Sequence, residues 1–194
     1  MTPAGRPLDQ QVSAAIREAT LRLLVRDGFA ALSIEGVARE AGVGKPAIYR
    51  RFAGKPELVV AAIATALPPM EPPPPGDAET RLRTLFATLP ADADAYLALI
   101  GGLFAEHRRH PELIAAFREQ LLLPRRKVVS DALVEAQERG EVRADVEPEH
   151  LLDLLAGPLL ARTFAGRDVG PGWREAAFAD WWKLVRPDAR FAPA

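Results

Sequence analysis

A group of basic and aromatic side chains between residues 45 and 55 holds the clearest candidates for chemistry in this chain. Lys45, Tyr49, Arg50, Arg51 and Lys55 fall within this one short segment. An arginine guanidinium presents a paired donor fork that fits a guanine edge, whereas lysine and tyrosine more naturally hold phosphate. A short helix with these residues exposed can enter the major groove of DNA. Helix-glycine-helix spacing alone favours an ordinary helical hairpin with a solvated basic face, because helical hairpins are a common motif.

Other chemistries find little support in the residue types present. The chain has no cysteine, which excludes disulfides, thiolate metal sites and sensing by cysteine oxidation. His107 and His110 have a spacing that could bind metal, but with Pro111 between the helical turns an exposed helix end is the favoured interpretation. We find no nucleophile with a base partner and no glycine-rich phosphate loop. We therefore expect no enzyme, no catalytic residues, no metal site and no cofactor.

The first helix that must position the basic segment is predicted from about Leu8 to Arg26. Apolar residues recur there at i, i+4, i+7 and i+11, which is the spacing of one helix face. Asp27 and Gly28 then give a stop signal, because glycine readily adopts the left-handed geometry that follows a helix end. The apolar stripe consists of Val12, Ile16, Ala19 and Leu23.

A second helix and a tight turn come directly before the basic segment. Ser33 is suited to cap the second helix, because a serine hydroxyl accepts a hydrogen bond from a free N–H of the first turn. The segment 42–44 is too short and too rich in glycine for anything but a turn, and a third helix is predicted over residues 45–52, with Pro46 tolerated in its first turn. The buried stripe of the second helix consists of Ile34, Val37, Ala38 and Ala41.

Two apolar residues are expected to hold the third helix against the others. At 100° per residue Ile48 and Phe52 point together, while Arg50 points roughly the opposite way. Tyr49 and Arg51 fall to either side of that direction. The pattern therefore predicts a helix-turn-helix unit with a cationic outer side.

Charge is unevenly distributed along the chain. Residues 1–56 carry nine basic and five acidic side chains, whereas the whole chain has a net charge of −1. A basic N-terminal segment followed by an acidic remainder indicates an anionic partner for one end only.

Length and composition are those of a globular protein. The chain has 194 residues, 48% hydrophobic and 26% charged, which suits one or two domains with a real core. The N-terminus has no apolar run typical of a signal peptide, and no apolar stretch reaches the length of a membrane span. We expect a cytoplasmic protein with no membrane partner.

The string AREAGVGKPAIYRRFAGKPEL, residues 38–58, closely resembles the DNA-binding signature of the TetR family of bacterial transcriptional regulators. The resemblance is specific over about residues 8–66 and rests on length and helix layout for the rest. It implies that Lys45, Pro46, Arg50 and Arg51 face base edges. It also implies that Ser33, Tyr49 and Lys55 hold the DNA backbone, Lys55 as a simple phosphate cation. The complete set of predicted DNA-binding residues is Ser33, Gly44, Lys45, Pro46, Ala47, Tyr49, Arg50, Arg51 and Lys55.

Two residues of this set depart from the usual pattern of the family. Gly44 stands where serine is frequent, and Ala47 stands where threonine or serine is frequent. A helix cap and a hydroxyl contact are therefore missing, although the docking geometry is retained.

Proline marks the end of the N-terminal part. The segment 68–76 contains six prolines in nine residues, which forbids a helix and favours a stiff linker. Helical patterns resume after it and no convincing strand is present, so the expected fold is all-α with about nine or ten helices. We predict an N-terminal three-helix helix-turn-helix DNA-binding domain at 1–55, a connecting helix and proline-rich linker at 56–76, and a C-terminal helical effector-binding and dimerisation domain at 77–194.

The resemblance implies a ligand chamber in the helices after the linker and a dimer interface from the last two helices. Apolar stripes are also how any helix packs, so plain core is the favoured interpretation of each chamber residue taken singly. For each interface residue, intramolecular core and dimer contact are equal alternatives. The chamber candidates are Phe86, Leu89, Tyr96, Leu99, Ile100, Leu103, Phe104, Phe117 and Leu121. The interface candidates are Leu151, Leu154, Leu155, Pro158, Leu159, Arg162, Trp173, Phe178, Trp181, Trp182 and Val185.

Together these patterns and the family resemblance predict a sequence-specific DNA-binding regulator. The resemblance implies that it is a repressor, because repression is the commoner behaviour in the family. Its expected partners are a second copy of the chain, a near-palindromic operator in double-stranded DNA and a small-molecule effector. An alternative function is a helical adaptor that binds protein through the aromatic helix at Trp173–Trp182.

Overall fold

The structure, a computed structural model, describes residues 5–67, 69–88 and 93–187, and every regular element among them is helical. The predicted all-α fold is therefore confirmed. The chain divides into two compact units, Met1–Leu67 with Leu99–Leu122 and Pro68–Ala98 with Leu123–Ala194. Within the described residues, no helix has both the length and the apolar character needed to cross a membrane.

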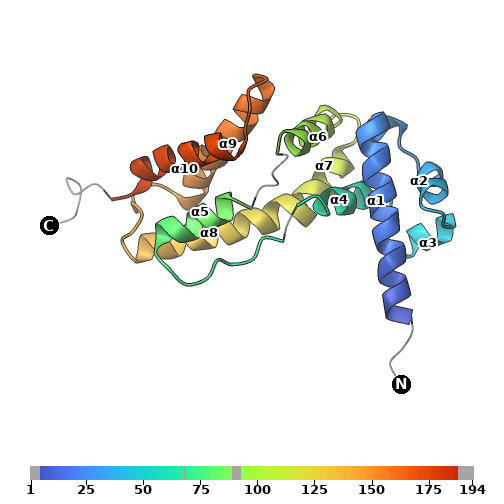
Figure 1. Cartoon of the computed structure of the whole chain (residues 1–194), viewed down its shortest axis with the longest axis horizontal. Helices are drawn as coiled ribbons and strands as arrows, with labels where there is room; N and C mark the ends of the chain where they lie inside the picture. The colour runs from blue at the N-terminus through green and yellow to red at the C-terminus, as the bar shows by residue number, and fades with distance from the viewer. Residues whose placement is uncertain (1–4, 68, 89–92, 188–194) are drawn as a thin grey trace. The chain divides into compact units, whose positions relative to one another are not determined.

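The first unit packs helices around a long N-terminal one (Figure 1). Helix α1 contacts both α2 and α4, α2 contacts α3, and α4 packs on α7 and on the widened turn η1. Helix α6 begins in the second unit and ends in the first. The elements are α1 (Gly5–Ala31), α2 (Ile34–Glu40), α3 (Lys45–Tyr49), α4 (Lys55–Ala64), α6 (Ala93–Ala105), α7 (Pro111–Phe117) and η1 (Arg118–Leu122).

The predicted stop after the first helix is present in the structure. Gly28 leaves the helical conformation at φ 77° and ψ 172° and separates the last residues of α1 from the rest. A left-handed φ of this kind strains residues with a Cβ, which explains the glycine. Before this kink, Ile16, Ala19 and Leu23 are buried as the periodicity predicted.

Pro124 does not interrupt the helical path, which continues from α7 through η1 into α8 (Leu123–Glu138). Proline lacks an N–H and clashes with the carbonyl four residues earlier. A π-type turn directly before Pro124 accommodates it, because the wider turn changes the bonding register.

Among the described residues of the second unit, four helices pack around the larger of two buried clusters. Figure 1 shows α5 along α8, and α9 with α10; α5 contacts α8 and α10, and α9 contacts α8 and α10. The elements are α5 (Ala78–Phe86), α8 (Leu123–Glu138), α9 (Pro148–Phe164) and α10 (Pro171–Val185). The segment 69–76 before α5 is not helical, as its prolines predicted.

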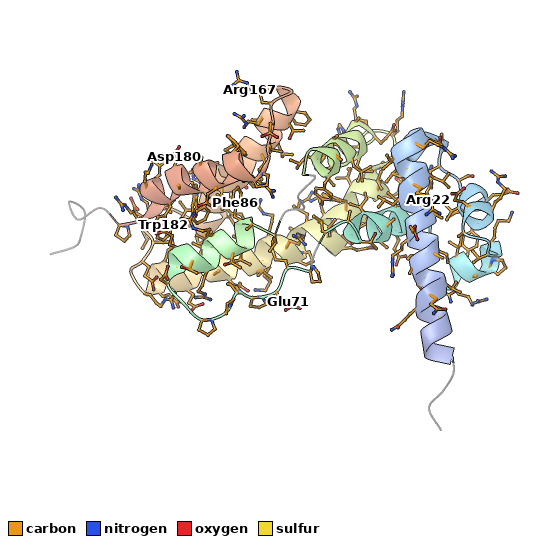
Figure 2. All side chains as sticks on the ribbon, in the orientation of Figure 1. Arg22, Glu71, Phe86, Arg167, Asp180 and Trp182 are labelled. Carbon is orange, nitrogen blue, oxygen red and sulfur yellow. The ribbon has the colours of Figure 1, made fainter. Side chains whose placement is uncertain are left out.

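Aromatic side chains form the centre of this core. Phe178 is fully buried, lies 6.0 Å from the Phe86 ring and stacks on Trp182 at 6.5 Å with an interplanar angle of 5° (Figure 2). Trp181 is 5% exposed, and its Nε1 donates a hydrogen bond to the Leu151 carbonyl at 3.1 Å. Burying the indole is therefore compatible with satisfying its N–H.

The division into compact units differs from the order along the chain. Residues Leu99–Leu122 pack with the N-terminal helices, although they follow the proline-rich segment. The functional boundaries at 55 and 76 stay predictions.

Candidate nucleic-acid interface

Helix α2 begins at the residue that the sequence indicated. Ser33 has an extended backbone, and its hydroxyl accepts a hydrogen bond from the Gly36 N–H at 3.0 Å. The side chain is exposed. Ser33 therefore stabilises the first turn of α2 and can still meet a phosphate there, where free N–H groups favour an anion.

The turn between α2 and α3 depends on Gly42. Its φ of 66° is left-handed, and the following Val43 N–H donates to the Ala38 carbonyl at 2.9 Å. Chain reversal in so few residues needs this conformation, which glycine adopts without strain. Val37 and Ala38 are buried on the inner side of α2.

Helix α3 ends at Tyr49 and is shorter than the predicted 45–52. The two apolar residues that the spacing predicted still anchor it, Ile48 within the helix and Phe52 just beyond its end. Ile48 is fully buried and Phe52 is 7% exposed. Pro46 and Arg50, on the opposite side, are exposed. The back of the helix is therefore fixed in the core while its front is open to water.

The exposed front is here called the α3 outer face. Tyr49 is 58% exposed and the Lys45 side chain 53% exposed. The Lys45 ammonium lies 3.7 Å from the Glu35 carboxylate. Because exposed ion pairs contribute little, DNA phosphate can replace this partner at small cost. The α3 outer face consists of Lys45, Pro46, Tyr49 and Arg50.

Arg51 is not on that face. Its side chain is 13% exposed and forms an ion pair with Asp9 of α1. Its guanidinium also donates to the Ser13 hydroxyl at 3.0 Å and to the Ala47 carbonyl at 2.7 Å. The expected outward position of Arg51 is wrong, because α1 supplies acceptors that the sequence pattern of α3 alone could not reveal.

Lys55 also has neighbours within the chain. Its Nζ lies 4.1 Å from the centre of the Phe29 ring. Burial lowers the pKa of Lys55, and the nearby Glu106 carboxylate opposes that shift. Its predicted role as a phosphate cation stays a prediction.

The predicted chamber residues are divided between the two units. In the second unit, Phe86 and Tyr96 both pack against a small buried cluster of Leu97, Leu159 and Val169. Burial raises the pKa of the Tyr96 phenol to about 12. Leu89 lies outside the described residues, and the remaining candidates, Leu99, Ile100, Leu103, Phe104, Phe117 and Leu121, fall in the first unit.

Those in the first unit are mostly core. Leu103 is 1% exposed, Phe117 is 4% exposed and Phe104 is 42% exposed. The rings of Phe104 and Phe117 meet edge to face at 6.0 Å. A ligand-binding role for these side chains remains a prediction.

Most of the predicted dimer-interface residues are buried inside the second unit. Each of six is at most 6% exposed, so the intramolecular alternative is correct for them: Leu151, Leu155, Leu159, Phe178, Trp181 and Val185. Trp173 and Trp182 are half-buried, as is Arg162, whose guanidinium lies 4.8 Å from the Trp173 ring centre. Leu154 and Pro158 are exposed. The aromatic surface suggested for an adaptor is accordingly largely core.

A different face of α9 is apolar and open. Leu154 is 51% exposed, Leu160 38% and Phe164 72%. We call this surface the α9 outer face; it consists of Leu154, Gly157, Pro158, Leu160, Ala161 and Phe164. Leu160 and Phe164 are not among the predicted interface residues, although positions 154, 157, 161 and 164 repeat at i, i+3, i+7 and i+10, a period that marks one helix side.

Comparisons with known proteins agree with this architecture. The family described as bacterial regulatory proteins, tetR family, matches residues 16–62, and the family described as tetracyclin repressor-like, C-terminal domain, matches residues 72–180. An uncharacterized HTH-type transcriptional regulator of Mycobacterium tuberculosis is 30% identical over 145 residues, which is 74% of this chain and 72% of that protein.

Two further proteins extend the likeness over most of the chain. The DNA-binding transcriptional repressor TetR of Mycobacteroides abscessus is 29% identical over 182 residues, 92% of this chain and 96% of that one. A solved structure from a Rhodococcus species, assigned to the TetR family, superposes with a TM-score of 0.69 at 19% identity, covering 90% of this chain and 96% of that one. At that identity the superposition shows a shared fold.

The all-helical fold, the helix α2 capped by Ser33 and the family matches together define a helix-turn-helix transcriptional regulator that binds DNA. The matched family and relatives are regulators and not enzymes. The chain belongs to the TetR family of bacterial regulatory proteins.

Proposed function

We propose that this TetR-family regulator is a repressor that binds a near-palindromic operator as a homodimer and responds to a small-molecule effector. The observation that carries the DNA-binding part is the α3 outer face, which is exposed and cationic on a helix whose opposite side is buried at Ile48. Because its proposed target is chromosomal DNA, the proposal includes a cytoplasmic location.

In the proposed complex α3 lies in the major groove. Arg50 donates to a guanine edge and Pro46 contacts a neighbouring base, while the flexible Lys45 side chain reaches a base edge and the adjoining phosphate. Ser33 and Tyr49 hold the DNA backbone, since both are exposed beside this face. Gly44 and Ala47 have no large side chains, so the helix can approach the bases closely. Arg51 is left out of base recognition because it holds α3 to α1.

The α9 outer face is proposed as the main dimer contact. Large exposed apolar residues gathered on one surface mark interaction sites. Leu154 and Phe164 are more than half exposed on a helix whose other side is in the core. A second copy of α9 is their proposed cover, which agrees with the family likeness.

Repression is proposed from a similar protein, and the effector response from two aromatic residues beside an apolar cluster. One similar protein is named a DNA-binding transcriptional repressor. Phe86 and Tyr96, partly buried beside a small apolar cluster, are proposed to line the effector site. An effector would alter DNA affinity by binding one arrangement of the dimer better than another.

Selection of bound duplexes from a random DNA pool tests the proposal. We expect two inverted half-sites whose centres are separated by one helical turn of DNA, about 34–36 Å, or by a multiple of that distance. Binding to the selected duplex should weaken steeply with salt, and Lys45→Gln should reduce the slope by about one.

Arg167→Ala is the matched control for loss of charge. Arg167 is an exposed cation of the second unit (Figure 2), and its removal should leave the salt slope unchanged. Recovery of no common sequence, or of a single unrepeated half-site, would contradict the proposal.

A further inference from the structure

A lysine, a buried ring and a histidine meet in the first unit. Phe29 follows the Gly28 kink of α1 and is 5% exposed. The Lys55 ammonium lies 4.1 Å from the centre of its ring, and the His110 ring meets it edge-on at 4.9 Å. The first residue of α4 and the residue before α7 therefore both contact the same ring near the end of α1. Together with Glu106 these residues are here called the Lys55 junction.

Glu106 brings a negative charge close to the same lysine. Its Oε2 is buried and accepts no hydrogen bond from the residues that the structure describes. Its charge acts on Lys55, raising the pKa of an ammonium that burial otherwise lowers. Between these two described residues no ion pair within 4.0 Å is formed, and the ammonium faces the Phe29 ring instead. A buried acceptor without a donor is costly, so closing this pair would be favourable.

His110 is held in place by a neighbour. Its Nδ1 lies 3.1 Å from a Glu112 carboxylate oxygen at the start of α7. Glu106 and His110 are thus both carried by the short connection from α6 to α7, and the His110 N–H donates to the Glu106 carbonyl at 2.8 Å. A shift of this connection would move Glu106 and the His110 ring together.

Helix α6 leads directly into this connection. Its last residues belong to the first unit, and Glu106 follows its final residue, Ala105.

We propose that Lys55 is a switched cation whose ammonium either binds a DNA phosphate or is held by Glu106, with the Phe29 ring as the intermediate position seen here. The inference rests on the proposed DNA-binding function. Withdrawal of the ammonium toward Glu106 moves it away from the DNA backbone and so removes one phosphate contact. The connection from α6 to α7 thereby sets DNA affinity without touching DNA.

The test measures DNA affinity and its salt dependence for Lys55→Gln, Glu106→Gln and the double variant, on the duplex selected with the wild-type protein. Glu106→Gln should tighten binding by roughly threefold or more and increase the salt slope by about one, because Lys55 is released to phosphate. Lys55→Gln should weaken binding more strongly in the Glu106→Gln background than in the wild-type one. Non-additivity of this kind is the signature of a direct pair.

Glu119→Gln controls for a general loss of negative charge. Glu119 is exposed on η1 in the same unit, and its neutralisation should leave the effect of Lys55→Gln unchanged. Thermal unfolding of every variant shows whether the fold is retained.

A second readout needs no DNA. The four lysines are dimethylated with ¹³C, which keeps their charge, and the Lys55 signal is assigned by its loss in Lys55→Gln. We expect the Phe29 ring to shift the NMR resonance of the Lys55 methyl groups in the free protein. This ring-induced shift should be absent in Phe29→Leu, and it should disappear when the wild-type protein binds DNA. An undisplaced Lys55 signal in the free protein, or additive effects of the two charge variants on binding, would overturn the switch. A wild-type protein that binds no duplex would instead overturn the proposed function and the switch with it.

Discussion

Helices α3 and α9 each have one buried and one exposed side, but the residues on their exposed sides differ in chemistry. Both bury one side completely, at Ile48 in α3 and at Leu151 and Leu155 in α9. The exposed side of α3 carries cations and a tyrosine, whereas that of α9 carries leucine and phenylalanine. A buried stripe therefore fixes a helix in the fold, and the chemistry of its other side indicates the partner.

The two exposed sides differ in the free-energy cost of exposing them to water. Lys45 and Arg50 are well solvated when free, and the exposed Lys45–Glu35 pair contributes little. Phe164 is 72% exposed, and covering such a side chain is worth about 1.5–3 kcal/mol. The α3 outer face can therefore remain open until DNA arrives, whereas the α9 outer face favours permanent cover.

The largest effect is expected on the buried side of α3. Ile48→Ala should lower the free energy of unfolding by about 2–5 kcal/mol, since Ile48 is fully buried and the cavity cannot be filled. Tyr49→Ala, one residue away but exposed, should cost far less. Urea unfolding followed by circular dichroism compares the two, and equal losses would show that α3 is not anchored as described.

A pH effect is expected on the buried side of α9, where Tyr96 packs beside Leu159. The pKa of the Tyr96 phenol is raised to about 12 by burial, so the unfolded chain ionises first, near pH 10. Stability is complete below pH 10 and falls as pH rises toward 12, by up to about 3 kcal/mol at about 1.4 kcal/mol per pH unit.

Tyr96→Phe isolates this contribution. Urea unfolding at pH 8 and pH 11.5 should show a smaller loss for the variant than for the wild-type protein, since phenylalanine cannot ionise. An identical loss in both proteins would mean that Tyr96 is not desolvated.

The exposed side of α9 should affect assembly and not folding. Phe164→Ser is expected to weaken the dimer by about 1.5–3 kcal/mol, roughly 10- to 150-fold in dissociation constant, without lowering the stability of the monomer. Analytical ultracentrifugation over a range of concentrations measures the constant. Val134→Ser, which removes a 40% exposed valine on α8 and so outside the last two helices, is the comparison variant, and an unchanged dimer in Phe164→Ser would assign the contact elsewhere.

The smallest effect is expected at the start of α2. Ser33→Ala removes the hydroxyl that accepts from Gly36 N–H and should cost about 1 kcal/mol of stability. Ser33→Asp should preserve the cap while placing a negative charge near DNA phosphate. Unfolding and DNA titration together separate the two roles. If Ser33 acts only as a helix cap, Ser33→Asp should retain both the stability and the DNA affinity that Ser33→Ala loses.

The contrast between these helices also explains what sequence could predict. Glycine at 28 and 42, Ser33 and the Ile48–Phe52 pair each report a local geometry, and each is found where the pattern indicated. Charge on one side of α3 reveals which side is exposed. In α9 both sides are apolar, so periodicity could not tell Leu155, which is core, from Leu154, which is exposed.

Contacts between residues far apart in the sequence are the second feature that could not be predicted. Arg51 is drawn inward by Asp9 and Ser13, which precede it by more than thirty residues. The packing of Leu99–Leu122 with the N-terminal helices is likewise a tertiary arrangement. Neither leaves a local signal, because the acceptors and the contacting faces lie on other helices.

Base preference at Arg50 gives the most direct measure of whether the α3 outer face reads DNA. Affinities of wild-type protein and Arg50→Ala are compared on the selected operator and on its single base-pair variants, with Arg167→Ala alongside. Arg50→Ala should lose about 1–3 kcal/mol on the operator and discriminate poorly at one position in each half-site, while keeping its preference elsewhere. Equal weakening on every duplex, with base preference intact, would contradict major-groove reading by this face.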